Sequence, residues 1–439
     1  MNTCQRNEIN VATHCPTSSR SVPDLQAPST LHLPARLTRD CLSAHDFDAL
    51  AKKRLPAPLY SFVAGGSEDH HAHVGSREAF LAYRFVPRVL CNVARVQQHV
   101  TVFGRSYQSP FGIAPMGGVA LTAYDGDLAL ARGAAHADIP MVVSGAALTS
   151  LEAIRAQASN AWFQAYLSAD RDADAALLDR VAAAGYETLV VTVDVPVAAN
   201  REHNKRSGYT APLRPNAALA WQALTHPRWL VGTLARTLLM GGVPRYRNLA
   251  AGNGARVFSS EAAHQFSRRA AFDWQDLARI RQRWRGNLVL KGILSAADTV
   301  IAREHGVDGV IVSNHGGRQL DSAIAPLTVL PEIVDAAAGL TVMIDSGIRR
   351  GTDILKALAL GAQMVFIGRP FNFAAAVGGA PGVAHLAALL RDEIARDMAL
   401  LGVSTLDALH SGFLRESRHP VSNMRNHERP SIPTRQPAA

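Results

Sequence analysis

The stretch GVIVSNHGGRQ, residues 309–319, joins a short β-branched run to a glycine-rich turn that carries a histidine and an arginine. Its first half is typical of a buried parallel strand, and the polar half indicates a loop at the carboxyl end of that strand. Seven further runs of this kind occur along the chain, each followed by a helix-like stretch rich in Ala, Leu and Arg. They are FGIAPM (111–116), MVVSG (141–145), AWFQAYL (161–167), TLVVTVDV (188–195), NLVLKG (287–292), TVMIDSG (341–347) and MVFIGR (364–369).

Eight alternating strand and helix units predict an α/β fold of the closed TIM (β/α)8 barrel type. Most runs end in polar or charged residues, although a buried strand does not need them and unpaired buried charge is costly. One such ending alone would be ordinary strand termination, but the repetition favours a functional site at the carboxyl mouth of the barrel. The endings are Ser144, Gln164 with Tyr166, Thr192 with Asp194, Lys291, Asn314, Asp345 and Arg369.

Composition sets the limits of the barrel domain within the 439 residues. The polar segments 1–40 and 415–439 are expected to be flexible tails, which leaves one domain at 41–414. Four cysteines without close pairs predict neither disulfides nor a zinc site. The N-terminal segment has no continuous apolar stretch, so we expect no signal peptide and a cytoplasmic location. A cluster at His70, His71 and His73 has no evident further ligand, so no metal is expected.

A long insertion between the fourth and fifth strands, at about 197–286, far exceeds a usual βα connection. From His203 to Ser260 it contains no acidic residue. Nucleic-acid binding, attachment to an anionic membrane surface and a lid over the mouth are all consistent with this charge. The apolar content favours the membrane over nucleic acid, and Pro227 argues against a membrane span. The basic residues are Lys205, Arg206, Arg214, Arg228, Arg236, Arg245, Arg247 and Arg256.

Within the turn after the sixth strand, His315 and Arg318 stand three residues apart. A guanidinium binds a carboxylate with two parallel hydrogen bonds, and an imidazole accepts a proton, so the pair suits one small acid ligand. The loops after strands seven and eight are where TIM barrels often bind phosphate, either of a cofactor or of a phosphorylated substrate. These loops supply Asp345, Gly347, Arg349, Gly368 and Arg369.

These motifs resemble the family of FMN-dependent 2-hydroxy acid oxidases and dehydrogenases, which includes glycolate oxidase, lactate oxidase and membrane-bound lactate and mandelate dehydrogenases. The resemblance covers roughly residues 45–412. It implies that FMN binds in the 41–414 domain and that an (S)-2-hydroxy acid is oxidised to the 2-oxo acid. It also implies a homotetramer and electron transfer to a membrane carrier or to oxygen. The matching stretches are SNHGGRQ (313–319), LPAPLYSFVAGGSED (55–69), IDSGIRRGTDILKALALGA (344–362) and FIGRP (366–370).

By this resemblance, His315 is the base, Asp194 supports its charged form, and Tyr166 hydrogen-bonds the substrate. Arg318 and Arg201 would bind the substrate carboxylate. Lys291 would place positive charge near the flavin N1 and C2 carbonyl, although a salt bridge towards a helix is an alternative role for it. The remaining expected cofactor contacts are Ser144, Gln164 and Thr192 at the ring edge, Pro115, Met116 and Gly117 after the first strand, Asp345 at the ribityl chain, and Gly347, Arg349, Gly368 and Arg369 at the phosphate.

Two departures from the family pattern concern the substrate. Phe62 stands where most members have a tyrosine whose hydroxyl helps to bind the carboxylate. This change predicts weaker binding of the carboxylate, a different acid, or replacement by a nearby group such as Tyr60. Gly117, Ala146 and Ala198 stand where larger or different residues are usual, which predicts a wide pocket for a bulky or aromatic acid.

The alternative to an enzyme is a membrane or nucleic-acid binding protein on a catalytically altered flavin barrel. We expect no nucleic-acid partner. If the enzyme is peripheral, we expect it on the inner face of the membrane.

Overall fold

The computed structural model describes residues 31–168, 170–210, 217–250, 252, 254–257, 259 and 269–417. Most of the two expected tails lies outside these residues. Two short elements lie in or at the edge of the described parts of these tails. Helix α1 (Ala35–Asp40) buries Leu37, and strand β12 (Leu414–Glu416) pairs antiparallel with β1 (Tyr83–Phe85). One buried leucine and a three-residue strand are too little apolar sequence to distinguish from a polar tail.

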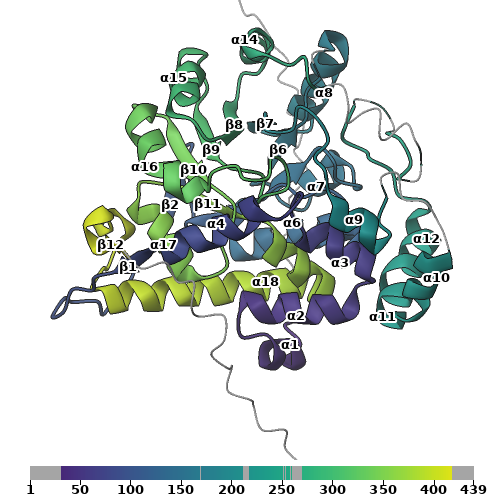
Figure 1. Cartoon of the computed structure of the whole chain (residues 1–439), viewed down its shortest axis with the longest axis horizontal. Coiled ribbons are helices and arrows are strands. Elements are labelled where there is room, and N and C mark those ends of the chain that lie inside the picture. Colours follow the sequence, from purple (N-terminus) through teal and green to yellow (C-terminus); the bar gives the residue numbers. More distant parts are fainter. Residues whose placement is uncertain are drawn as a thin grey trace, which may run out of the picture.

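Eight parallel strands form the barrel, and each coincides with one of the eight predicted runs (Figure 1). They pair in the order β4-β11-β10-β9-β8-β7-β6-β5. A parallel bridge between Ile113 and Met141 joins the first strand to the approach of the second and closes the ring. The strands are β4 (Phe111–Ile113), β5 (Val142–Ser144), β6 (Trp162–Ala165), β7 (Thr188–Thr192), β8 (Asn287–Ile293), β9 (Gly309–Val312), β10 (Thr341–Ile344) and β11 (Met364–Ile367).

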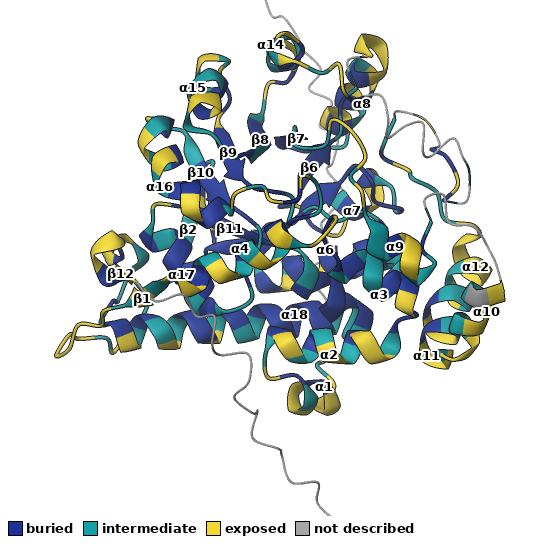
Figure 2. Ribbon diagram, viewed as in Figure 1, coloured by how far each residue is buried: buried dark blue, intermediate teal, exposed yellow. Residues whose placement is uncertain are grey.

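The amino-terminal end of the barrel is plugged by the hairpin of β2 (Val100–Val102) and β3 (Arg105–Tyr107). Tyr107 accepts a hydrogen bond from Trp162 Nε1 at 3.2 Å, and the Phe103 ring lies 5.5 Å from the Trp162 ring. Side chains from each strand between β5 and β11 fill the interior above this plug, and the strands are buried along nearly their whole length (Figure 2). The carboxyl mouth is therefore the end of the barrel available for chemistry.

An outer layer of helices covers the strands because each strand is followed by a helix with one apolar face. The long helix α18 (Arg369–Leu401) packs on α6 and on α2 (Ala44–Arg54) along one side of the barrel (Figure 1). Among the described residues it is the one helix long and apolar enough to cross a membrane, but 61% of its most apolar window is buried inside the protein. The others are α6 (Gly126–Ala137), α7 (Leu151–Arg155), α8 (Arg171–Ala183), α14 (Trp274–Arg283), α15 (Ala296–Glu304), α16 (Pro326–Ala337) and α17 (Gly351–Ala359).

Helices α3 (Ala57–Ala64) and α4 (His71–Leu81) bring the N-terminal segment against the loops of the mouth. Asp321, which follows β9, accepts hydrogen bonds from the backbone amides of Asp69 and Ala72 at 3.1 and 2.9 Å. Ser67 N donates to Gly317 O at 2.9 Å. These contacts fix the turn between α3 and α4 over the loop that follows β9.

The insertion after β7 begins with α9 (Glu202–Ser207) and continues in a small helical lobe beside α3 (Figure 1). The lobe consists of α10 (Ala217–Leu224), α11 (Pro227–Trp229), the π-helix η1 (Leu230–Ala235) and α12 (Arg236–Gly241). Among the described residues, two hydrogen bonds attach it to the barrel domain: Trp229 Nε1 donates to Leu121 O at 2.9 Å, and Gln222 Oε1 accepts from Ala57 N at 3.3 Å. Trp229 is consequently buried.

Candidate active site

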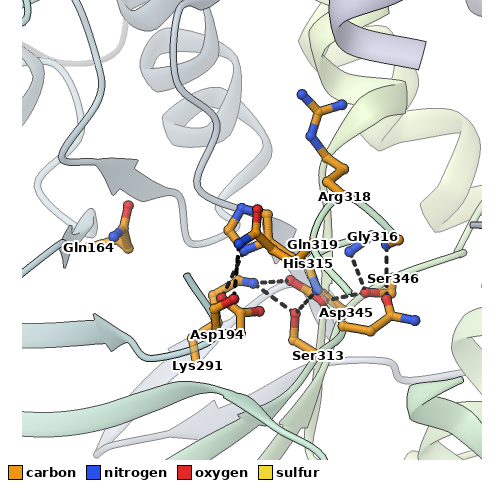
Figure 3. Close-up of polar contacts among 12 residues, drawn as sticks. Gln164, Asp194, Lys291, Ser313, His315, Gly316, Arg318, Gln319, Asp345 and Ser346 are labelled. Carbon is orange, nitrogen blue, oxygen red and sulfur yellow. Dashed lines mark hydrogen bonds and ion pairs between the residues drawn. The ribbon is translucent and has the colours of Figure 1, made fainter. Parts of the chain in front are cut away.

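Four consecutive strand ends meet at the mouth and place their polar residues in one cluster (Figure 3). His315 Nδ1 lies 2.9 Å from Asp194 Oδ1, which follows β7. Lys291, at the end of β8, lies 3.0 Å from Asp345 Oδ2 and donates to Ser313 Oγ at 2.8 Å. The expectation that the strand endings converge at one mouth is confirmed for these residues.

The backbone after β9 turns sharply because three successive residues adopt left-handed conformations, with φ of 58° at His315, 66° at Gly316 and 69° at Gly317. A side chain at Gly316 would meet the Arg369 guanidinium, and one at Gly317 would meet the backbone of His73. Glycine is therefore required at both positions for the loop to lie this close to its neighbours. The strained conformation at His315 directs its ring to Asp194.

The protonation of this pair suits a base. Burial lowers the pKa of His315 below its usual 6.5, with Asp194 acting in the opposite direction. Burial would raise the pKa of Asp194, but the charges of His315 and Lys291 lower it overall. At neutral pH the imidazole is then neutral beside an ionised carboxylate. Because Nδ1 faces Asp194 it carries the hydrogen, which leaves Nε2 as the nitrogen that accepts a proton.

Lys291 is almost fully buried yet remains charged. Burial would lower its pKa, but the carboxylates of Asp345 and Asp194 raise it above the usual value. Ser346, which sequence reasoning missed, links this pair to the His315 loop because its hydroxyl donates to Asp345 Oδ1 at 2.8 Å and accepts from Gly316 N at 3.0 Å. The partners of Lys291 lie at the mouth, so its alternative role as a salt bridge towards a helix does not apply.

Arg318 does not converge with His315 on one point as expected; its side chain points away from the His315 ring (Figure 3). Arg318 Nη1 donates to the carbonyls of Val63 at 3.3 Å and Gly65 at 2.9 Å. Arg369 donates to the same two carbonyls, at 3.0 and 2.8 Å. Two guanidiniums thus share the carbonyl groups at the C-terminal end of α3, where the helix dipole is negative.

These arginines are cations without a carboxylate partner among the described residues. Burial, together with neighbouring arginines, lowers the pKa of Arg318 well below its usual range and that of Arg369 to about 9. Burial likewise lowers the pKa of Arg349 to about 10. A bound anion lowers the free-energy cost of burying these positive charges. Arg201 anchors the same loop, donating to Arg318 O and Gln319 Oε1 at 3.1 Å each.

The loops after β10 and β11 have the geometry of a phosphate site. Gly347 has φ of 86° and packs on the backbone of Ser76, and Gly368 is the N-cap of α18. A helix N-terminus with free amides and nearby guanidiniums favours a phosphate group. Met116, from the loop after β4, lies beside Gly368, so the first and eighth units meet at this point.

On the opposite side of the mouth, buried polar atoms lack partners within the described residues. Gln164 Oε1 accepts from Ser144 Oγ and Gly145 N at 3.3 Å each, but its Nε2 donates to nothing. Thr192 Oγ1 and Asp194 Oδ2 are also buried without a hydrogen bond. Buried polar atoms are nearly always hydrogen-bonded, so these unpaired atoms indicate a ligand that carries hydrogen-bond donors and acceptors along one edge. The isoalloxazine ring of FMN has such an edge, so these residues fit the cofactor.

The aromatic residues expected near the substrate have partners that the sequence did not reveal. The Phe62 ring stacks on Tyr209 with centroids 4.6 Å apart, and the Arg269 guanidinium lies 3.8 Å from the Tyr166 ring centroid. Tyr209 and Arg269 come from the insertion, whose path no periodic pattern predicts. Tyr60 donates its hydroxyl to Asp48 at 2.8 Å, so it does not replace the hydroxyl missing at position 62.

The small residues of the expected pocket are only partly brought together. A methyl group added at Gly117 would lie 2.7 Å from Ala146 Cβ, so glycine here permits two loops to touch. Pro115 and Gly117 are partly exposed at the mouth, while Ala198 is exposed and takes no part in this contact.

The histidines near the start of α4 form a separate group, with the rings of His70 and His203 5.1 Å apart. Among the described residues no three metal-ligating side chains are grouped to hold an ion.

Comparison with known proteins decides the family. The model of FMN-dependent dehydrogenases matches residues 51–416. This chain belongs to that family. It is 36% identical to (S)-mandelate dehydrogenase of Pseudomonas putida over 86% of this chain and 95% of the relative. It is 37% identical to an L-lactate dehydrogenase of Caulobacter sp. (strain K31), over 85% and 98%, and 38% identical to an L-lactate oxidase of Nostoc sp. (strain PCC 7120 / SAG 25.82 / UTEX 2576), over 85% and 98%.

The fold comparison agrees with the sequence comparison. The crystal structure of the monotopic membrane protein (S)-mandelate dehydrogenase matches with a TM-score of 0.80 and 35% identity, covering 86% of this chain and 100% of that one. The protein is thus an FMN-dependent oxidoreductase on a TIM barrel, and FMN is its cofactor. The alternative of a binding protein on a catalytically altered barrel is not supported, since the His315, Asp194 and Lys291 cluster is intact.

Proposed function

We propose that this enzyme oxidises a 2-hydroxy acid with a bulky or aromatic side chain to the 2-oxo acid. The observation that carries the proposal is the buried His315–Asp194 pair, whose Nδ1 to Oδ1 contact leaves Nε2 as a base. The buried, unpaired polar atoms of Gln164 and Thr192 lie at the end of strands that open on the same mouth. FMN, when bound, accepts the two electrons that leave the substrate carbon. The relatives named for mandelate and lactate support the substrate class.

In this proposal His315 Nε2 takes the substrate proton. The imidazolium that forms is stabilised by Asp194, because that carboxylate is already ionised and in contact with Nδ1. Lys291 keeps a positive charge next to the ring site, and Asp345 holds the Lys291 ammonium in place. Tyr166 supplies a further hydroxyl to the substrate.

Arg318 and Arg201 bind the substrate carboxylate. Arg318 has to exchange the carbonyls of Val63 and Gly65 for the carboxylate, which is favourable because a charged acceptor makes stronger hydrogen bonds than a carbonyl. Arg369 and Arg349 bind the cofactor phosphate together with the amides at Gly347 and Gly368. Pro115, Met116 and Gly117 line the cofactor from the side of the first strand.

The size of the substrate is supported by the relative named for mandelate. The short side chains at Gly117 and Ala146 do not by themselves widen the site, because the two loops touch there. The test is anaerobic bleaching of the flavin absorption by a panel of acids, from glycolate to mandelate-like and long-chain 2-hydroxy acids. We expect kcat/KM to be at least tenfold higher for the bulky acids. A preference for glycolate would overturn the size argument, and bleaching by none of the acids would overturn the substrate class.

We further propose that the helical lobe α10–α12 lies on the anionic inner face of a membrane, where a quinone or similar carrier takes electrons from the enzyme. Within the lobe Trp221, Leu224, Val231, Leu239 and Met240 are exposed (Figure 2). Exposed apolar groups at this density mark an interaction surface, and the flanking arginines add electrostatic attraction. A homotetrameric assembly is part of the same proposal, and light scattering of the detergent-solubilised holoenzyme tests it.

A further inference from the structure

The stack of Phe62 on Tyr209 bears on binding of the substrate carboxylate, so the role of this stack rests on the proposed function. Phe62 belongs to α3, and its position is one where the resemblance implies a tyrosine hydroxyl. Its ring lies nearly parallel to that of Tyr209, with 19° between the planes. The two rings therefore occupy adjacent layers of one stack.

Helix α9 explains how Tyr209 reaches this position. Arg201 is the N-cap of α9, and Tyr209 follows its C-terminal glycine, where Tyr209 N donates to Asn204 O at 2.8 Å. Ser61 of α3 donates to His203 O at 3.3 Å and holds α9 against α3. One short helix thus presents both an arginine of the expected carboxylate site and a tyrosine.

The surroundings of the Tyr209 hydroxyl fit a donor to an anion. The guanidiniums of Arg318 and Arg201 lie close enough to interact electrostatically with the phenol. Burial nevertheless raises the pKa of Tyr209, so the hydroxyl keeps its proton throughout the working range of pH. No hydrogen bond to another described residue engages this hydroxyl. Arg318 also lies over the Phe62 ring at 5.2 Å, so the stack and the guanidinium share one wall of the site.

We propose that Tyr209 supplies the hydroxyl that position 62 lacks and donates it to the substrate carboxylate beside Arg318 and Arg201. The hydroxyl donor has moved from one ring of the stack to the other, from α3 to the segment after α9. Tyr209 is thus a substrate-binding residue located in the insertion. It also links the insertion to recognition of the acid group.

Three variants test this role. Tyr209→Phe removes only the hydroxyl and keeps the stacked ring. Phe62→Tyr with Tyr209→Phe moves the hydroxyl to the other ring, and Phe62→Tyr alone is the matched control. Each holoenzyme is titrated with the 2-oxo acid product, followed by perturbation of the flavin spectrum, and with the corresponding 2-oxo amide, which lacks the carboxylate charge. Anaerobic flavin reduction by the 2-hydroxy acid gives the kinetic effect.

We expect Tyr209→Phe to weaken binding of the oxo acid and to lower kcat/KM by roughly 10- to 100-fold, the range for a hydrogen bond to a charged group. Binding of the amide should change less than about threefold, and the double variant should recover most of the loss. Unchanged acid binding in Tyr209→Phe, or an equal loss for acid and amide, would overturn the proposal. Failure of the wild-type enzyme to bind or oxidise any 2-hydroxy acid would instead overturn the proposed function.

Discussion

The barrel mouth and the helical lobe α10–α12 differ in which groups they bury: the mouth buries ionisable groups, and the lobe exposes apolar ones. At the mouth, ionisable groups are buried and held by partners: the Lys291 ammonium by Asp345, and the His315 imidazole by Asp194. In the lobe, Leu239 and Met240 are 84% and 75% exposed. Buried charges in fixed positions are costly for folding and useful for chemistry, whereas exposed apolar groups are useful only for contact with another surface.

The difference implies that the chemistry at the mouth and the surface contact of the lobe can be changed independently. The electrostatic arrangement at the mouth depends on strand ends that the barrel fixes. The lobe contacts the barrel domain elsewhere, through hydrogen bonds of Trp229 and Gln222. In addition, the Arg236 guanidinium lies 3.9 Å from the Tyr124 ring centroid. Changes at the mouth should therefore alter chemistry without altering surface attachment. Changes in the lobe should do the reverse.

The largest effect is expected for His315→Gln. Glutamine keeps a polar side chain in the loop but cannot accept the proton, so flavin reduction by substrate should fall roughly 10²- to 10⁴-fold. Stopped-flow absorbance under anaerobic conditions measures this rate. The flavin content of the purified variant is the control and should stay near one per chain. Near-normal reduction would show that His315 is not the base.

Arg318→Lys should be less severe, with kcat/KM reduced by roughly 10- to 100-fold. Lysine keeps the charge but replaces a planar two-pronged donor with a point charge, and its amine also makes fewer contacts with the carbonyls of Val63 and Gly65. Steady-state kinetics should show most of the change in KM for the acid. A wild-type KM would mean that Arg318 serves only to hold the end of α3.

Asp194→Asn should lower the plateau of kcat/KM by about tenfold and move its acid limb to lower pH. The base works when neutral, so activity rises with pH through the pKa of His315, which burial has already lowered and which Asp194 opposes. Removing Asp194 takes away that opposition, so the pKa falls further. A pH profile of kcat/KM from about pH 4 to 8 measures both changes. An acid limb that stays in place would contradict the proposed contact.

The sequence predicted the mouth well and the insertion poorly, for one physical reason. Strand ends such as Lys291 and Asp345 are fixed by a two-residue alternation and by parallel pairing, so their convergence can be read from spacing. The stacking of Phe62 on Tyr209 joins α3 to a segment 147 positions further along the chain, and no local pattern encodes it. The orientation of Arg318 likewise depends on the carbonyls of Val63 and Gly65, which carry no sequence signal.

The smallest expected effect concerns the lobe. Leu239→Ser with Met240→Ser removes two exposed apolar side chains from α12 and should weaken sedimentation with anionic liposomes by about tenfold, the order expected for partial burial of such groups. Salt screens the arginines but not the apolar contacts, so the wild-type enzyme should keep part of its binding at high salt and the variant should lose it.

The matched control for that test is Leu42→Ser with Leu400→Ser, because these residues are exposed to a similar degree, 69% and 68%, but lie outside the lobe. This control should sediment like the wild-type enzyme, and both variants should retain normal flavin reduction because neither touches the mouth. Equal weakening in both would mean that the enzyme binds lipid through general surface hydrophobicity. Unchanged sedimentation of the lobe variant at every salt concentration would show that α12 does not contact the membrane and that its exposed side chains face another partner.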